Sequence, residues 1–140
     1  MCENKKTYLR IYSSDRSSGT SSSPVFYLNK SIEGITAFQV KQVIFEKNNI
    51  TSNTIKINSR ELSNLTTDNI RGTYNGASQT IHEINILANA VNYFGDSPKY
   101  LCQKSNLNVI SFELKDSDGS SDVAGLNDDE TWSMLLCFNQ

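Results

Sequence analysis

Residues 8–46 read YLRIYSSDRSSGTSSSPVFYLNKSIEGITAFQVKQVIFE and contain three strand-like runs separated by polar turns. Aromatic and β-branched residues dominate residues 8–12, which suits a pleated, partly buried surface. Residues 25–28 follow Pro24, which is tolerated at the first position of a strand. We expect a strand in both runs, joined by a long polar loop over residues 13–23 whose Ser, Thr, Gly and Asp side chains satisfy turn backbones rather than fill a core.

The third run begins at Ile35, after a turn that we expect over residues 29–34. Apolar and polar residues alternate at first, but residues 43–45 are apolar in succession. This change of phase near Gln42 predicts either a β-bulge or a strand that passes from half-buried to fully buried.

The middle of the chain is less regular. Residues 54–58 alternate and predict a fourth strand, which we expect to pair with the third as a hairpin. Residues 60–68 are ambiguous, because two leucines three apart suit a helical turn whereas the surrounding Ser, Asn and Thr favour a loop. Residues 70–74 predict a short edge strand ending at the turn pair Asn75-Gly76.

One amphipathic helix is expected over residues 80–94. Thr80 and Glu83 form a T-x-x-E capping box, and apolar residues then recur at helical spacing up to Gly95.

Two further strands are predicted near the end of the chain, over residues 107–115 and 132–138, with a loop over residues 116–129 between them. The last strand carries a bulky face of Trp, Met, Leu and Phe, and its other face is only partly polar. This pattern indicates a central position in a sheet or an interface.

Several strands, polar turns and one helix predict a mainly β fold, an antiparallel jelly-roll-like β-sandwich. A chain of 140 residues is long enough for one core. We therefore expect a single domain over residues 1–140, with residues 1–6 as a mobile N-terminal arm. The predicted core comprises Phe26, Leu28, Phe38, Val40, Ile44, Ile57, Leu87, Phe112, Trp132, Leu136 and Phe138.

The composition argues against several classes of function. The formal net charge is -2, so the whole molecule does not attract phosphate, which argues against nucleic-acid binding. Neither a run of 18 apolar residues nor an apolar N-terminal segment occurs, so we expect a soluble protein made in the cytosol. Cys2, Cys102 and Cys137 are odd in number and far apart, which predicts thiols rather than disulfides or a zinc site.

The candidates for chemistry are weak. His82 is the only histidine, and we expect it to be a surface residue in the first turn of the helix. Residues 116–122 differ from a calcium loop in the position of glycine, which favours a solvated loop. The adjacent carboxylates Asp128, Asp129 and Glu130 do not by themselves lie across a substrate. We expect a non-enzymatic protein without a metal or cofactor.

A binding face is a stronger candidate. Tyr8, Tyr12 and Tyr27, with Arg10 and Arg16, would supply the aromatic and arginine anchors that protein interfaces favour. The alternative is ordinary packing between strands.

Short motifs at both ends of the chain are similar to those of a known protein family. Residues 14–22 read SDRSSGTSS and precede a short apolar strand, and residues 32–35 then read IEGI before a long strand. This order resembles the opening of minor capsid and related structural proteins of large double-stranded DNA viruses of eukaryotes and of their virophages. Members of that family open with an S-x-D-R-x-S-G-x-S turn and an I-x-G-(V/I) turn, and often close on an L-G-F-like end. Residues 47–50 and Cys137 depart from the pattern, which has Ile-Pro-Asn and glycine there.

The resemblance implies a virion structural protein of a giant virus or virophage, a minor capsid or vertex-associated component made in the host cytoplasm. Its partners would be other capsid proteins and further copies of itself. The alternative is a receptor- or carbohydrate-binding module of a virion fibre, with a glycan as partner. An enzyme that uses the carboxylates of residues 128–130 is a third hypothesis.

Self-assembly is the most specific expectation. Leu135 and Cys137 lie opposite the bulky face of the last strand, so more apolar surface is available than one small core can take. We expect a homo-oligomer, and under the capsid hypothesis a trimer or pentamer rather than a dimer.

Overall fold

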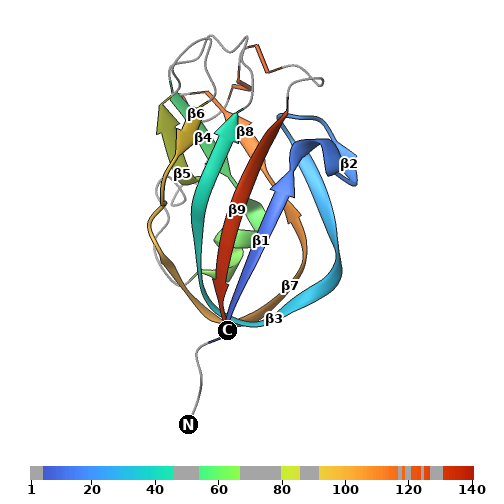
Figure 1. The fold of residues 1–140 in the computed structure, drawn as a ribbon, viewed down its shortest axis with the longest axis vertical. Coiled ribbons are helices and arrows are strands. Elements are labelled where there is room, and N and C mark those ends of the chain that lie inside the picture. Colours follow the sequence, from blue (N-terminus) through green and yellow to red (C-terminus); the bar gives the residue numbers. More distant parts are fainter. Residues whose placement is uncertain are drawn as a thin grey trace.

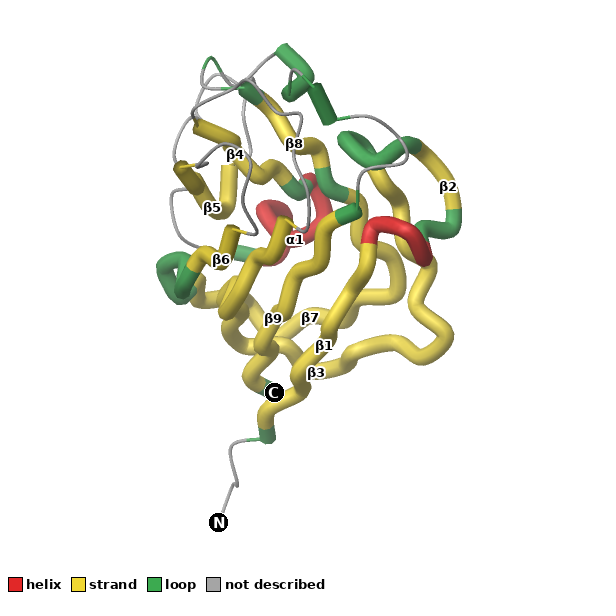
Figure 2. Tube along the Cα trace, turned by 45° about the horizontal axis from the view of Figure 1, so that its top comes forward, coloured by secondary structure: helices red, strands yellow, loops and turns green. Residues whose placement is uncertain are grey.

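Antiparallel strands in two sheets make up most of the described chain, as the sequence predicts (Figures 1 and 2). In the computed structural model, the described residues are 5–45, 54–66, 80–85, 92–116, 118, 121–123, 125–126 and 131–140. The mainly β, antiparallel sandwich is confirmed, and the jelly-roll order of its strands stays a prediction.

The larger sheet is built on β3 (Pro24–Phe45), a strand of 22 residues. The second half of β3 pairs with β9 (Trp132–Asn139), and β9 pairs on its other side with β1 (Lys6–Tyr12). The predicted central position of the last strand is therefore confirmed. β1 also begins earlier than expected, because the carbonyl of Lys5 accepts a hydrogen bond from the Gln140 amide at 2.8 Å.

β3 pairs with β7 (Tyr100–Ser111) from Val25 to Phe38, and its first two residues, Pro24 and Val25, also pair with β2 (Ser18–Gly19). β6 (Asn92–Phe94) pairs with the far end of β3. β7 thus begins earlier than the predicted strand at residue 107.

The predicted turn over residues 29–34 is wrong, because β3 runs through it as a bent strand. Its pairing with β7 shifts register three times between Tyr27 and Ala37. Such irregularities bend and twist a strand. Figure 1 shows β3 passing down one side of the molecule, turning at the bottom and rising beside β9.

The bulge predicted near Gln42 is confirmed. Val40 lies opposite Leu136, and Gln42 lies opposite the next residue of β9, Leu135, so Lys41 is the extra residue. A bulge of this kind reverses which side chains face the core beyond it.

The reversal corrects one predicted core residue. Beyond the bulge, Val43 and Phe45 are fully buried, whereas Ile44 is only partly buried on the outer side. Ile44 has the same parity as Phe38 and Val40, which is why an uninterrupted strand would have placed it inside.

The second sheet contains β5 (Thr80–Asn85), β4 (Thr54–Asn58) and β8 (Glu113–Lys115), in that order. The strand over residues 54–58 is confirmed, but its predicted pairing with β3 is wrong. Both edges at the end of β3 are already occupied, by β9 and by β6.

The helix predicted over residues 80–94 is wrong. Residues 80–85 form β5 and residues 92–94 form β6, while residues 86–91 lie outside the described part. Ile81 and Ile84 are three apart and both buried because the pairing of β4 with β5 shifts register at Ile81. This bulge produces the spacing that resembles a helix.

The α-helix of the described chain is α1 (Arg60–Leu65), within the segment that the sequence left ambiguous. The hydroxyl of Ser59 caps it by accepting from the Leu62 amide at 3.3 Å, and Leu62 is fully buried. Glu61 joins the helix to β7, since its carboxylate accepts from the amide and hydroxyl of Ser111 at 2.8 and 2.7 Å.

Most of the predicted core is confirmed. Leu28 packs against it while partly buried. The predicted residues that are buried are Phe26, Phe38, Val40, Ile57, Phe112, Trp132, Leu136 and Phe138. Several predictions lie outside the described residues, namely the arm residues 1–4 with Cys2, the strand over 70–74 with its Asn75-Gly76 turn, Leu87, and the carboxylates of residues 128–130.

Trp132 connects the core to the loop over residues 13–23. Its indole nitrogen donates to the Ser21 carbonyl and its amide to the Ser13 hydroxyl, both at 2.9 Å. Its ring contacts Phe45 and, edge to face at 6.2 Å, Phe112. Ser13 and Ser21 are fully buried, and the Ser13 hydroxyl satisfies a backbone amide, as expected for the side chains of this loop.

Replacement of Trp132 tests this connection. We expect Trp132→Phe to lower the free energy of unfolding by about 2–3 kcal/mol, because it leaves a cavity and removes the hydrogen bond from the indole to the Ser21 carbonyl. Urea unfolding measures the loss. Tyr27→Phe, at a side chain that is 65% exposed, serves as the control and should change stability by less than about 0.5 kcal/mol. Equal stability of the two variants would contradict the assigned role.

Candidate functional site: a groove between β1 and β3

β1 pairs with β9 on one side, and no strand of the described chain pairs with its other edge. The bond from Gln140 to Lys5 sets the alternation of the ladder. The residues that exchange backbone hydrogen bonds with β9 are then Thr7, Leu9 and Ile11. Those whose N–H and C=O groups point away from β9 are Tyr8, Arg10 and Tyr12.

A cavity of about 550 Å³ lies between this edge and the first half of β3, and we call it the groove. Its volume is in the usual range for ligand sites. Apolar side chains from both strands line it: Leu9, Ile11, Phe26, Leu28 and Ile32. Polar residues and tyrosines also line it: Lys5, Tyr12, Asp15, Tyr27 and Lys30.

The two ends of the groove differ in charge. At one end, Gln140 bridges the strands, since its side-chain amide donates to the Glu33 carbonyl at 2.8 Å and its side-chain oxygen accepts from the Thr7 hydroxyl. Lys5, two residues before Thr7, and Lys30, three residues before Glu33, both line the groove. Asp15, just beyond β1, lines the opposite end.

Three of the predicted interface residues line the groove, namely Arg10, Tyr12 and Tyr27. Tyr8, Tyr12 and Tyr27 are 58%, 45% and 65% exposed, so they are not ordinary core packing. Exposed aromatic side chains that gather in one region are typical of interaction surfaces.

Tyr8 and Leu135 share the outer face of the sheet with Arg10. Arg10 lies opposite Leu135, and its guanidinium reaches across to donate to the side-chain oxygen of Gln42 at 2.8 Å. The bulge makes this contact possible, because it places Gln42 opposite Leu135. We call Tyr8, Arg10, Tyr12 and Leu135 the outer face.

Arg16, the remaining predicted residue, holds its own turn. Its guanidinium donates to the carbonyls of Gly19 at 3.1 Å and Ser13 at 3.0 Å. Gly19 has a φ of 85°, and a Cβ there would lie 2.1 Å from the Ser23 carbonyl oxygen. Arginine and glycine are thus both required by the geometry of this turn.

The groove itself was missed from the sequence. The expected turn over residues 29–34 would have removed one of its walls, and an open strand edge carries no pattern of its own. Leu9 and Ile11 in one run, and Phe26 and Leu28 in the other, indicate two apolar strands but do not show that these strands leave a space between them.

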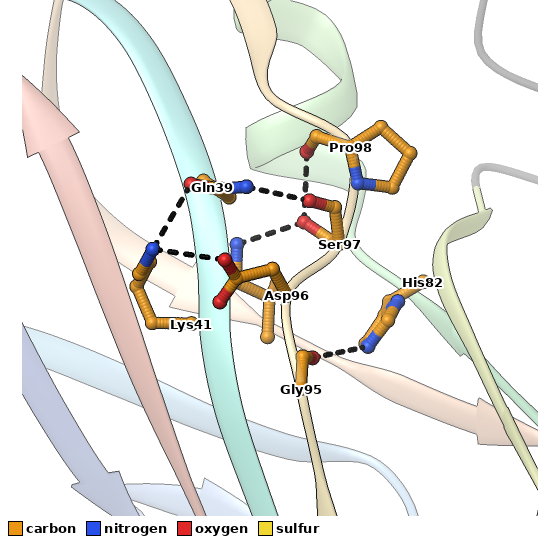
Figure 3. Close-up of polar contacts among 8 residues, drawn as sticks. Gln39, Lys41, His82, Gly95, Asp96, Ser97 and Pro98 are labelled. Atoms are coloured by element: carbon orange, nitrogen blue, oxygen red, sulfur yellow. Dashed lines mark hydrogen bonds and ion pairs between the residues drawn. The ribbon is translucent and has the colours of Figure 1, made fainter.

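His82 lies on β5 rather than in a helical turn, so its predicted location is wrong. Its Nε2 is 3.1 Å from the Gly95 carbonyl (Figure 3). The neighbouring Asp96 forms an ion pair with Lys41 at 3.1 Å, and the Ser97 hydroxyl accepts from the Val40 amide at 2.9 Å. This network ties residues 95–98 to both sheets and gives His82 a structural partner.

Two carboxylates of the described part of the 116–122 loop have partners nearby in the sequence. Asp118 accepts from the amide and hydroxyl of Ser121, and Asp122 pairs with Lys115 at 2.8 Å. Across the described residues, no group of three or more His, Cys, Asp or Glu side chains could hold a metal ion. Cys102 and Cys137 are thiols, as predicted.

No protein-family model matches this chain, and no curated protein matches it. In the described part of the chain, no helix has the length and apolar character needed to cross a membrane.

The His82 network predicts a pH-dependent stability. Burial lowers the pKa of His82 below 6.5, against the opposing effects of Gly95, Asp96 and Glu83. His82 then binds a proton less readily in the folded protein than in the unfolded chain. The contribution of its neutral form to stability is therefore fully present above pH 6.5 and is lost as the pH falls below that value.

We expect the free energy of unfolding to fall more steeply from pH 7 to pH 5 in the native protein than in His82→Gln, which does not titrate. Urea unfolding at each pH gives the difference, and the shared carboxylates cancel in the comparison. Parallel pH profiles would contradict the assignment.

Proposed function

We propose that this protein is a virion structural component that acts through protein–protein contacts rather than through catalysis. The observation that carries the proposal is the exposure of Tyr8, Tyr12 and Tyr27 around the open edge of β1. Aromatic side chains beside an unpaired strand edge are costly for a protein without a partner, because they invite association.

The virion setting rests on the resemblance at the two ends of the chain, and the packing supports it. The turn that carries the S-x-D-R-x-S-G-x-S pattern is held by Arg16 and requires Gly19. Trp132 then bonds this turn to the apolar last strand through Ser13 and Ser21. The two segments that carry the resemblance therefore form one structural unit.

Mass spectrometry of purified particles from the source tests the setting. We expect peptides of this chain in the particles at levels comparable to other minor capsid components, and retained after the particles are washed at high salt. Detection in infected-cell lysate but not in particles would contradict the proposal. Clear, saturable binding on a glycan array would favour the receptor- or carbohydrate-binding alternative.

Self-assembly through the outer face is the second part of the proposal, with a trimer or pentamer as the expected state. Tyr8 and Leu135 are side chains of the kind that anchor interfaces, and Arg10 is held between them by Gln42. Light scattering coupled to size exclusion should show an oligomer that becomes a monomer in Tyr8→Ser/Leu135→Ser.

Leu101→Ser is the matched control, because Leu101 is 57% exposed on β7, a strand that pairs with β3 and with neither β1 nor β9. It should leave the oligomer intact. A native protein that remains a monomer at high micromolar concentration would rule out self-assembly and leave attachment to a different capsid protein.

A further inference from the structure

We propose that the groove accepts an extended segment of a partner polypeptide, which adds to β1 as an antiparallel strand. Its alternate side chains are apolar and enter the cavity, and acidic residues near its C-terminal end lie beside Lys5 and Lys30. This inference rests on the proposed function in that it specifies the kind of partner that the protein holds.

The first argument is the regularity of the free edge. β1 keeps one register with β9 along its 7 residues, from Lys6 opposite Asn139 to Tyr12 opposite Ser133. Bulges, prolines, short strands and charged side chains usually protect an edge, and of these β1 has only the charged residues Lys6 and Arg10. The backbone groups of Tyr8, Arg10 and Tyr12 form a template for a further strand.

The second argument is the lining of the groove. Side chains of an added strand would alternate between the outer surface and the cavity. Apolar side chains line both sides of the cavity among polar ones, Leu9 and Ile11 from β1 and Phe26 and Leu28 from β3. Apolar side chains at every second position of the segment would fill this space.

Charge is distributed unevenly along the groove, which places the acidic residues of the segment at one end. Lys5 and Lys30 lie toward one end, and neither has an ion-pair partner among the residues that the structure describes. Asp15 lies at the other end, toward which β1 runs. An antiparallel segment ends beside the two lysines, so acidic residues belong in its C-terminal half.

The shape of the site selects a lone segment over the β1 strand of a second copy. In a second copy, β1 already has β9 along one side. Here the groove is bounded by β1 and by β3, so an entering strand has protein on both sides. A strand that is already part of a sheet cannot enter such a space without leaving that sheet.

Selection of random heptapeptides displayed on phage, against the immobilised full-length protein, tests the proposal without assuming a sequence. We expect enriched peptides to alternate apolar with other residues and to carry Asp or Glu in the C-terminal half. The best peptide, synthesised with a fluorescent label, should bind saturably by anisotropy.

Lys5→Glu/Lys30→Glu should weaken that binding by about tenfold or more, because both changes reverse charge at the groove. The matched control is Lys99→Glu/Lys104→Glu, which makes the same charge change at exposed lysines that do not line the groove, and it should bind within about twofold of the native protein. N-methylation of the peptide amides that face β1 should abolish binding. Thermal melting of both variants checks that they fold.

The proposal is overturned if no peptide is enriched over bare support, if binding ignores the Lys5 and Lys30 changes, or if N-methylated peptides bind equally well. It is also overturned if the native protein dimerises without peptide and Lys5→Glu/Lys30→Glu abolishes the dimer, since the occupant is then a second copy. Peptide binding by a protein absent from particles would contradict the virion setting alone. Presence in particles without any groove binding would contradict this inference alone.

Discussion

The bond from the buried indole of Trp132 to the Ser21 carbonyl is the interaction on which the rest of the structure depends. Through it, the central strand β9 holds the polar loop that precedes β3. The same ring packs on Phe112, at the junction of β7 and β8, and on Phe45 at the end of β3. Four segments that are far apart in the sequence are therefore fixed relative to one another by a single side chain.

This anchoring explains why the groove is preformed. At one end, the loop fixed by Trp132 leads directly from β1 into β3, and Arg16 and Gly19 hold its shape. At the other end, Gln140 connects Thr7 with Glu33. The two walls are thus joined at both ends and separate between them, which lowers the ordering cost of binding an extended segment.

Irregular pairing of β3 with β7 and β9 allows this one strand to bend around the core and form part of both sides of the molecule. The register shifts between Tyr27 and Ala37 bend it around the core, and the bulge at Lys41 turns its later side chains to the opposite face. The bulge also places Gln42 where it can hold Arg10, so the outer face depends on the same irregularity. Residues 95–98 complete the arrangement by occupying the edge of β3 at Val40 (Figure 3).

Much of the fold could be predicted because local patterns dominate the long strands. The strict alternation of Trp132 to Phe138 and the change of phase near Gln42 both had the structural meaning that the sequence indicates. Prediction failed where pairing between distant segments decided the outcome. The bulge at Ile81 places two buried isoleucines three residues apart, which is the spacing expected of a helix. β4 belongs to the other sheet because both edges at the end of β3 are occupied.

Part of the candidate site could be predicted from local sequence, and part of it depends on how distant strands pair. Residue type alone identifies Tyr8, Tyr12 and Tyr27 as candidate interface anchors, and all three are exposed. The groove between their strands could not be predicted, because it exists only where β1 and β3 fail to pair. That absence of pairing is a property of the whole sheet order and not of any local stretch.

The central claim is that the edge of β1 is open and ready to accept a strand. Native-state hydrogen exchange, followed residue by residue by NMR on the protein alone, tests it most directly. The account predicts alternating rates along β1, with the amides of Tyr8, Arg10 and Tyr12 exchanging on the order of a hundredfold faster than those of Leu9 and Ile11, which bond to β9. Uniformly slow exchange along β1 would contradict the account, because it would mean that the edge is already covered.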